Sequence, residues 1–290
     1  MSVRNYHYTR RNGFTCYGWS NKNKSLVPLS DAGARLLIGY ELEKSFNIDW
    51  NADADEYLDD ISDEMLSEVG DYIGTESDSS VDDGFEIVSM PMTIQAHVKS
   101  DWIDRLCGII NSHDPIEGDN GMHVHISRAG LGTTVKAQDL AIAKMALMLE
   151  LHSDKFYDLA RRDYEESGWA YPIECKQYAL HSRDLSRAVR NTDDSRYHSI
   201  NLTNSNTVEF RIFADTSSAH IVKATLELVH AVATYCMTHT LDVIRDGSFY
   251  SFAKWAITSG KYMHLPEYLL ERNCIDSYDY NYFTSFVANN

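Results

Sequence analysis

Cysteine is scarce in this sequence, with five in 290 residues. The five are widely scattered: Cys16, Cys107, Cys175, Cys236 and Cys274. Their odd number and the lack of any Cys-x-x-Cys pair argue against a zinc ribbon and against a disulfide framework. A reducing, cytoplasmic location is therefore expected.

Long apolar runs are absent as well. The longest apolar-rich stretch, Leu140 to Leu151, is interrupted by Lys144 and Glu150. A membrane-spanning helix needs about 20 apolar residues in succession. The first residues, Met1 to His7, also lack the apolar core of a secretion signal. We expect neither a membrane segment nor export.

Basic residues are few: the sequence has 26 lysines and arginines but 43 aspartates and glutamates, which gives a net charge of −17. Such a surface repels phosphates and excludes non-specific nucleic acid binding. Part of the acid forms one run, 49–71, in which five side chains have the offsets of a calcium loop: Asp49, Asn51, Asp53, Asp55 and Asp60. An EF-hand requires glycine where this sequence has Ala54 and glutamate where it has Asp60. A solvated acidic surface is therefore the preferred interpretation of this run.

The remaining composition is that of a globular protein, with 43% apolar residues, 18 tyrosines and only five prolines. Alternating apolar and polar residues predict strands at 36–43, 84–89 and 121–127, and a hairpin of 197–203 with 207–213. Helical patterns cover 100–111, with Ser100 as its cap, then 136–162 and about 217–241, followed by two or three shorter helices. This mixture, without regular βαβ alternation, predicts an α+β fold with a mainly antiparallel sheet.

Each predicted strand carries ionisable residues on one face. Three pairs lie two positions apart and so point the same way: Glu41 and Glu43, His123 and His125, Glu209 and Arg211. Glu86 stands alone between two apolar residues. On an inward face each unpaired charge costs several kcal/mol, and carboxylates on the same face also repel one another. Divalent cations would remove both the cost of burial and this repulsion. Any one of these features has an ordinary explanation as the wet face of a sheet or a surface ion pair, but four on one chain favour a site.

The order of four motifs resembles that of a known family. The motifs are Gly39-Tyr-Glu-Leu-Glu43, Asp78-Ser-Ser with Gly84-Phe-Glu-Ile-Val-Ser89, Gly121-Met-His-Val-His-Ile-Ser127 and Thr207-Val-Glu-Phe-Arg-Ile-Phe213. Together they resemble the amidoligase family, a branch of the glutamine synthetase and glutamate–cysteine ligase superfamily of carboxylate–amine ligases. The Gly-Met-His-Val-His segment is also similar to the histidine signature of glutamine synthetases. The resemblance spans about residues 36–215.

The resemblance implies a fold and an activity. The fold would be a curved, mainly antiparallel sheet with helices on one face, in a single catalytic domain over 1–290 that has a helical C-terminal part at 216–290. The activity would be ATP-dependent amide-bond formation through an acyl phosphate, with two or more Mg²⁺ or Mn²⁺ ions. Amino acids, peptides or amines would be the substrates, with no nucleic acid or membrane partner. The particular substrates and the role of residues 1–35 are not implied.

The resemblance also implies roles for individual residues. Six would bind metal: Glu41, Glu43, Asp78, Glu86, His123 and Glu209. His125 would lie near the nucleotide phosphates, and Arg211 would contact phosphate or a substrate carboxylate, with Arg196 as a second nucleotide-binding cation. Glu43, His125 and Arg211 would be the catalytic residues. Asp82 and Asp83 remain alternatives to Asp78, because both lie between it and Glu86.

Two other classes of protein fit part of the pattern. A zinc or iron enzyme could use His123, His125 and Glu209 as a facial triad, but this alternative leaves Glu41, Glu43 and Glu86 without a role. A non-catalytic binding protein could retain the fold, although every expected ligand position is occupied. The carboxylate–amine ligase accounts for the most residues.

Overall fold

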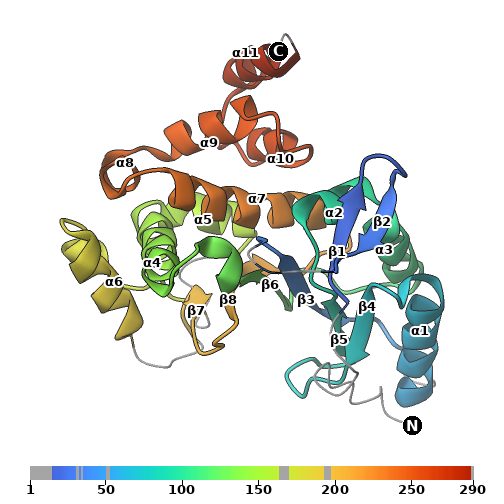
Figure 1. The fold of residues 1–290 in the computed structure, drawn as a ribbon. Helices are drawn as coiled ribbons and strands as arrows, with labels where there is room; N and C mark the ends of the chain where they lie inside the picture. The colour runs from blue at the N-terminus through green and yellow to red at the C-terminus, as the bar shows by residue number, and fades with distance from the viewer. Residues whose placement is uncertain are drawn as a thin grey trace. The chain divides into compact units, whose positions relative to one another are not determined.

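The computed structural model describes residues 15–30, 33, 35–49, 53–162, 170–192 and 197–288. They belong to two compact units. Figure 1 labels the helices and strands of both. The first comprises the described parts of Met1–Ala32, Leu37–His125 and Ala214–Val222, and the second those of Gly33–Leu36, Ile126–Phe213 and Lys223–Asn290. Among the helices of these residues, none combines the length and apolarity that crossing a membrane requires.

The first unit is built on β-strands. A two-stranded sheet pairs β1 (Tyr17–Ser20) with β2 (Ser25–Pro28). Four further strands are hydrogen-bonded in the order β4 (Ile73–Glu76), β5 (Gly84–Ser89), β3 (Ile38–Ser45) and β6 (Gly121–Ser127), the last of which ends in the second unit. The helices are α1 (Ala54–Val69), α2 (Ile94–Lys99) and α3 (Trp102–Ser112). The pairs β3–β5 and β4–β5 are both antiparallel.

The alternation along β3 separates an apolar face from an acidic one. Ile38, Tyr40 and Leu42 are at most 1% exposed, and the Tyr40 ring stacks on Trp102 of α3 with 6.0 Å between centroids. The intervening Glu41 and Glu43 point to the opposite face and are partly exposed. Burial of the apolar face against α3 therefore fixes which side of the sheet carries the acids.

The second unit is mainly helical. Its elements are η2 (Arg128–Leu131), α4 (Val135–Leu151), α5 (Ser153–Ala160), η3 (Lys176–Tyr178), α6 (Ser182–Arg190), β7 (Ile200–Asn201), β8 (Thr207–Ala214), most of α7 (Ala219–Thr238), α8 (Leu241–Asp246), α9 (Phe249–Thr258), α10 (Leu265–Glu271) and α11 (Ser277–Ala288). Strands β7 and β8 pair antiparallel. Helix α4 packs on α6 and α8, and α9 packs on α10 and α11.

The predicted fold class, α+β with a mainly antiparallel sheet and helices packed on it, is confirmed. The three isolated strands lie where alternation placed them, within about two residues. The predicted hairpin is present, but its first strand is reduced to the two residues of β7. A single catalytic domain over the whole chain stays a prediction.

Several helix predictions were wrong in detail. The pattern over 136–162 forms two helices, because His152 (φ −125°, ψ 33°) leaves helical geometry between α4 and α5. Ser100 ends α2, with its Oγ donating to the Ala96 carbonyl at 2.6 Å, and does not cap α3. Part of the acidic run is α1, whose first backbone N–H groups are capped by Asp53. Four helices, rather than two or three, follow α7 in the part of the chain that the structure describes.

Candidate metal centre

A row of three glutamates crosses the sheet of the first unit. Glu43 on β3 lies directly opposite Glu86 on β5, and Glu86 lies directly opposite Glu76 on β4. Directly paired residues of antiparallel strands point to the same face, and like charges in such positions repel. We call Glu43, Glu86 and Glu76 the glutamate row. This arrangement indicates that a cation between the strands, or a proton on one of the carboxylates, is needed to offset the repulsion.

Two histidines of β6 face Glu41. His123 Nδ1 lies 3.5 Å from Glu41 Oε2, and His125 Nε2 lies 3.1 Å from Glu41 Oε1. His123 Nε2 is 3.8 Å from Glu43 Oε1. Burial alone would raise the pKa of Glu41, but the hydrogen bonds and charges of His123 and His125 hold that pKa well below its usual range. Glu41 is therefore an anion at neutral pH.

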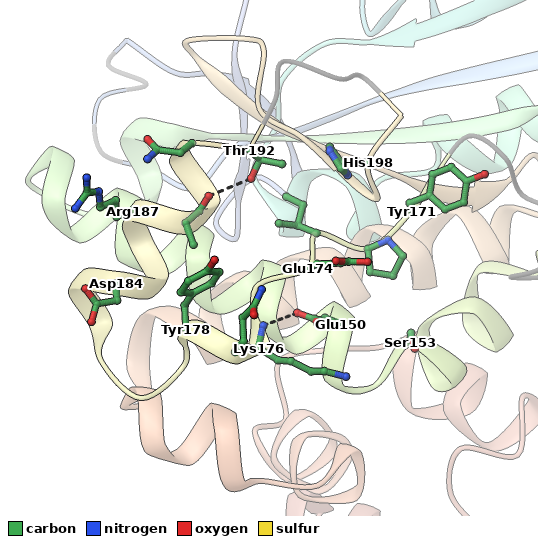
Figure 2. Close-up of a pocket in the computed structure, with 15 residues that line it drawn as sticks. Glu150, Ser153, Tyr171, Glu174, Lys176, Tyr178, Asp184, Arg187, Thr192 and His198 are labelled. Atoms are coloured by element: carbon green, nitrogen blue, oxygen red, sulfur yellow. Dashed lines mark hydrogen bonds between the residues drawn. The ribbon is translucent and has the colours of Figure 1, made fainter.

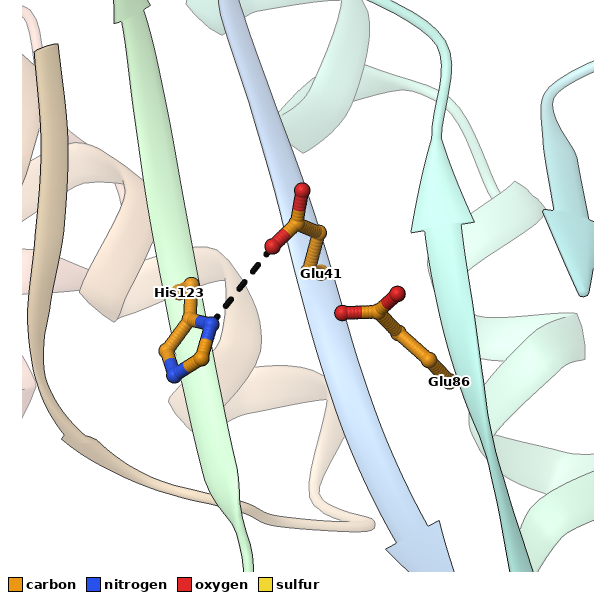
Figure 3. A group of neighbouring side chains, drawn as sticks. All are labelled: Glu41, Glu86 and His123. Carbon is orange, nitrogen blue, oxygen red and sulfur yellow. Dashed lines mark ion pairs between the residues drawn. The ribbon is translucent and has the colours of Figure 1, made fainter. Parts of the chain in front are cut away.

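Glu86 has the opposite character, although it lies close to Glu41 (Figure 3). Burial, followed by the charges of Glu41, Glu43, Asp78 and Glu76, raises the pKa of Glu86 to about 9. Without a cation, this carboxyl holds a proton at neutral pH. A divalent ion would displace that proton, because its positive charge would stabilise the ionised form of Glu86 among the surrounding carboxylates.

Within the described part of the first unit, two groups of three side chains could hold an ion, and Glu86 belongs to both. In each group the ligand atoms lie within 4.8 Å of one another: Glu41, Glu86 and His123 in one, Glu43, Asp78 and Glu86 in the other. Five carboxylate or imidazole side chains thus converge, and we call them the carboxylate cluster. Hard oxygen donors with one imidazole suit Mg²⁺ or Mn²⁺, so the donor set fits the expected ions.

Local backbone structure holds two members of the carboxylate cluster. Glu43 Oε2 accepts a hydrogen bond from the Gly121 N–H at 2.8 Å. Asp78 Oδ1 accepts from both the N–H and the hydroxyl of Ser80 at 2.8 Å, which fixes the turn before β5. The exposed Asp82 and Asp83 belong to neither group of candidate ligands. Of the three aspartates, the geometry thus favours Asp78.

Glu76 was missed at the sequence level. Its strand has only four residues, so alternation was too short to be recognised. The available sequence signal was the alternation of Ile73 and Thr75 with Gly74 and Glu76, which places Glu76 on the face opposite Ile73. Glu76 contributes to the charge around Glu86 without belonging to either group of candidate ligands among the described residues.

Glu209 and Arg211 lie on the β8 part of the second unit. Glu209 is 6% exposed, accepts a hydrogen bond from Asn201 Nδ2 at 2.7 Å and forms an ion pair with the Arg211 guanidinium. Their predicted roles as metal ligand and anion contact stay predictions. Arg196, the proposed second cation, lies outside the described residues.

The second unit also contains an open cavity of about 1230 Å³ (Figure 2). Its walls come from the end of α4, η3, α6 and the neighbouring loops, and include Glu150, Tyr171, Lys176, Arg187 and His198. Glu150 is occupied by the Cys175 and Lys176 N–H groups, each at 2.7 Å. Of the predicted site residues that the structure describes, none lines it. Its charged side chains carry both signs, so the cavity does not define a ligand of one charge.

No protein-family model matches the chain, and no curated protein matches it significantly. Sixteen chains of solved structures are similar. One is from the crystal structure of the complex between prokaryotic ubiquitin-like protein Pup and its ligase PafA, with 8% identity and a TM-score of 0.36 over 88% of this chain and 62% of that one. The chain thus spans less than two thirds of that protein's length, and likeness at this level assigns no activity.

Proposed function

We propose that this protein is an ATP- and Mg²⁺-dependent carboxylate–amine ligase. The observation that carries the proposal is Glu86, which belongs to two adjacent groups of candidate metal ligands at once. A carboxylate shared in this way suits a pair of ions, and paired ions are a recurrent feature of phosphoryl-transfer sites. Many kinds of enzyme transfer phosphoryl groups. The order of the sequence motifs favours one of them, a ligase that forms an acyl phosphate.

The carboxylate cluster would hold the ions. Glu41, Glu86 and His123 are assigned to one ion, and Glu43, Asp78 and Glu86 to the other, with Glu209 as a further ligand. When bound, Mg²⁺ neutralises charge on the phosphate oxygens during in-line transfer. His125, which already contacts Glu41, is assigned to the nucleotide phosphates.

The reaction has two steps. A substrate carboxylate oxygen attacks the γ-phosphorus of ATP, the bond to the β,γ-bridging oxygen breaks, and ADP leaves. An amine nitrogen then attacks the acyl carbon, the carbon–oxygen bond to phosphate breaks, and the amine gives up a proton as the amide forms. Arg211 is assigned to an anionic oxygen of phosphate or substrate, because its planar guanidinium binds two oxygens at once. No side chain forms a covalent intermediate in this scheme.

The test is release of ADP and phosphate that requires Mg²⁺ and a mixture of amino acids, peptides and amines. Glu43→Ala and Glu209→Ala should abolish release while the circular dichroism spectrum stays unchanged. Glu56→Ala, at an exposed position of α1, serves as the matched control and should keep full activity. Failure to bind ATP combined with failure to turn over any mixture would overturn the proposal. Tightly retained stoichiometric zinc without nucleotide affinity would replace it with a transition-metal enzyme.

A further inference from the structure

Lys44 is a fully buried cation on the apolar side of β3. It follows Glu43 in the chain, so its side chain leaves the strand on the face opposite the carboxylate cluster. Its Nζ donates three hydrogen bonds, to the Ile116 carbonyl at 2.6 Å, Glu117 Oε1 at 2.9 Å and Asp215 Oδ2 at 2.7 Å. All three ammonium protons therefore have acceptors, which is the condition for burying this charge.

Asp215 connects Lys44 to the loop that precedes β6. Its side chain is also fully buried, and its Oδ1 accepts from the Gly118 N–H at 2.7 Å and the Asn120 N–H at 3.2 Å. The Asp215 N–H donates back to the Asn120 carbonyl at 3.1 Å. Gly118 has φ +85°, a conformation that favours glycine, so the loop is shaped to place both N–H groups on one carboxylate.

Glu117 and Ser45 complete the attachment of this loop. Glu117 accepts from the N–H and the hydroxyl of Ser217, and these bonds together with Lys44 outweigh burial and lower its pKa. Asn120 Nδ2 donates to Ser45 Oγ at 2.9 Å. The loop 115–120 is thus tied to β3 and to the segment after β8 by charged and polar side chains that no step of the reaction uses.

The residue after this loop is Gly121, whose N–H donates to Glu43 Oε2 at 2.8 Å. Lys44 is hydrogen-bonded to Asp215, and Asp215 to the N–H of Asn120. Asn120 is followed in the chain by Gly121, whose N–H binds Glu43, the residue before Lys44. We infer that Lys44 and Asp215 are positioning residues, which fix the Glu43 carboxylate for the cation by holding Gly121. This inference rests on the proposed function, because it assumes that Glu43 binds the ion. Groups that orient metal ligands typically contribute about 10- to 100-fold to metal affinity.

The experiment measures Mn²⁺ dissociation constants of the full chain by electron paramagnetic resonance of free Mn²⁺. Asp215→Asn keeps the side-chain shape but removes the charge that binds Lys44, and should weaken Mn²⁺ binding about 10-fold or more. The same change made in a Glu43→Gln background should weaken binding no further, since its effect passes through the Glu43 carboxylate. Equal weakening in both backgrounds would overturn the inference and leave a purely structural role.

A control and a milder variant keep the outcome clear. Ser62→Ala removes a different buried hydrogen bond of the first unit, to Thr75 Oγ1 at 2.7 Å, and should lower thermal stability without changing Mn²⁺ affinity. Should Asp215→Asn fail to fold, Ser217→Ala replaces it and should weaken Mn²⁺ binding by a few-fold, an effect that Glu43→Gln again removes. Wild-type protein without Mn²⁺ affinity would refute the proposed function itself. If the wild-type protein binds Mn²⁺ and both Asp215→Asn and Ser217→Ala bind it with the same affinity, the positioning role alone is refuted.

Discussion

Two neighbouring glutamates in this protein have opposite protonation behaviour. Glu41 faces two imidazoles and is held ionised, whereas Glu86 faces four carboxylates and is held neutral up to about pH 9. Burial raises the pKa of both carboxyls, and the two imidazoles reverse that effect at Glu41, whereas the neighbouring carboxylates add to it at Glu86.

The stability of the cation-free protein should therefore increase when Glu86 is neutralised permanently. The unfolded carboxyl loses its proton near pH 4.5 and the folded one near pH 9, so Glu86 destabilises the fold over that range. Glu86→Gln should raise the free energy of unfolding at pH 8 in chelator by about 1 to 2 kcal/mol, a value reduced for the partial exposure of the side chain. Urea titration of both proteins measures the difference.

The same variant should lose Mn²⁺ affinity, because the shared ligand is gone. A more stable protein that binds Mn²⁺ less well is the expected combination, since functional sites commonly reduce stability. Glu56→Gln, on the exposed surface of α1, should change neither quantity. Lower stability of Glu86→Gln in chelator would show that the glutamate row is not under electrostatic strain.

At the scale of elements, a single buried carboxylate fixes the start of α10. Glu227 on α7 is completely buried and accepts the N–H groups of Met263, His264 and Leu265, each at 2.8 Å. The first N–H groups of a helix have no partner within the helix, and an anion there also interacts well with the helix dipole. Glu227 therefore docks α10 onto α7 within the second unit.

Glu227→Gln should lower the free energy of unfolding by about 1 to 3 kcal/mol, because one amide oxygen cannot replace two charged acceptors. Glu267→Gln, an exposed acid in the first turn of the same helix, is the matched control and should change stability by less than about 0.5 kcal/mol. Thermal or urea unfolding compares the two. Equal effects would mean that the helix dipole, rather than the three hydrogen bonds, dominates.

Sequence patterns predicted the strands well because burial on one face has a period of two. Ile38, Tyr40 and Leu42 fill the core and force Glu41 outward, so both β3 and its acidic face follow from local alternation. The break at His152 was missed, since apolar residues continue through it on both sides. Helical periodicity does not reveal where one helix stops when the next continues the pattern.

Long-range partners were beyond the sequence for a different reason. Lys44 is evident as a cation at an apolar position, but its partner Asp215 is 171 residues away. The cross-strand pairing of Glu43 with Glu86, and of Glu86 with Glu76, depends on strand order and register, which composition does not encode. The motifs proposed the five residues of the carboxylate cluster together with Glu209 as metal ligands, and this role stays a prediction. The fold adds that Glu86 belongs to two candidate ligand groups within the first unit.

At the scale of the whole molecule, buried histidines and Glu86 have opposite effects on how stability depends on pH. Burial lowers the pKa of both His97 and His230 to about 4, so below pH 6.5 the unfolded chain takes up protons that the folded chain refuses. Stability falls as the pH drops from 6.5 towards 4. Glu86 acts in the other direction, because stability falls as the pH rises from 4.5 towards 9.

The cation-free protein should consequently be most stable at about pH 6.5. Below that pH the buried histidines His97, His230 and His152, whose pKa values burial lowers, outweigh Glu86, and above it Glu86 reduces stability. Melting temperatures from pH 5 to 9 in chelator measure the curve. Glu86→Gln should flatten the alkaline side only, and His97→Gln should reduce the slope of the acidic side. A maximum that stays in place in both variants would assign the pH dependence to other groups.

The glutamate row also bears on how the sheet assembles. Glu43, Glu86 and Glu76 face one another only in the native register, because a shift of one residue would turn β5 over and bring Phe85 and Ile87 onto the acidic face. A divalent ion held by Glu43 and Glu86 would therefore select correctly paired strands as the chain folds. Refolding in Mg²⁺ would then be faster and more complete than refolding in chelator, so the cation would act as a template for the sheet that later uses it.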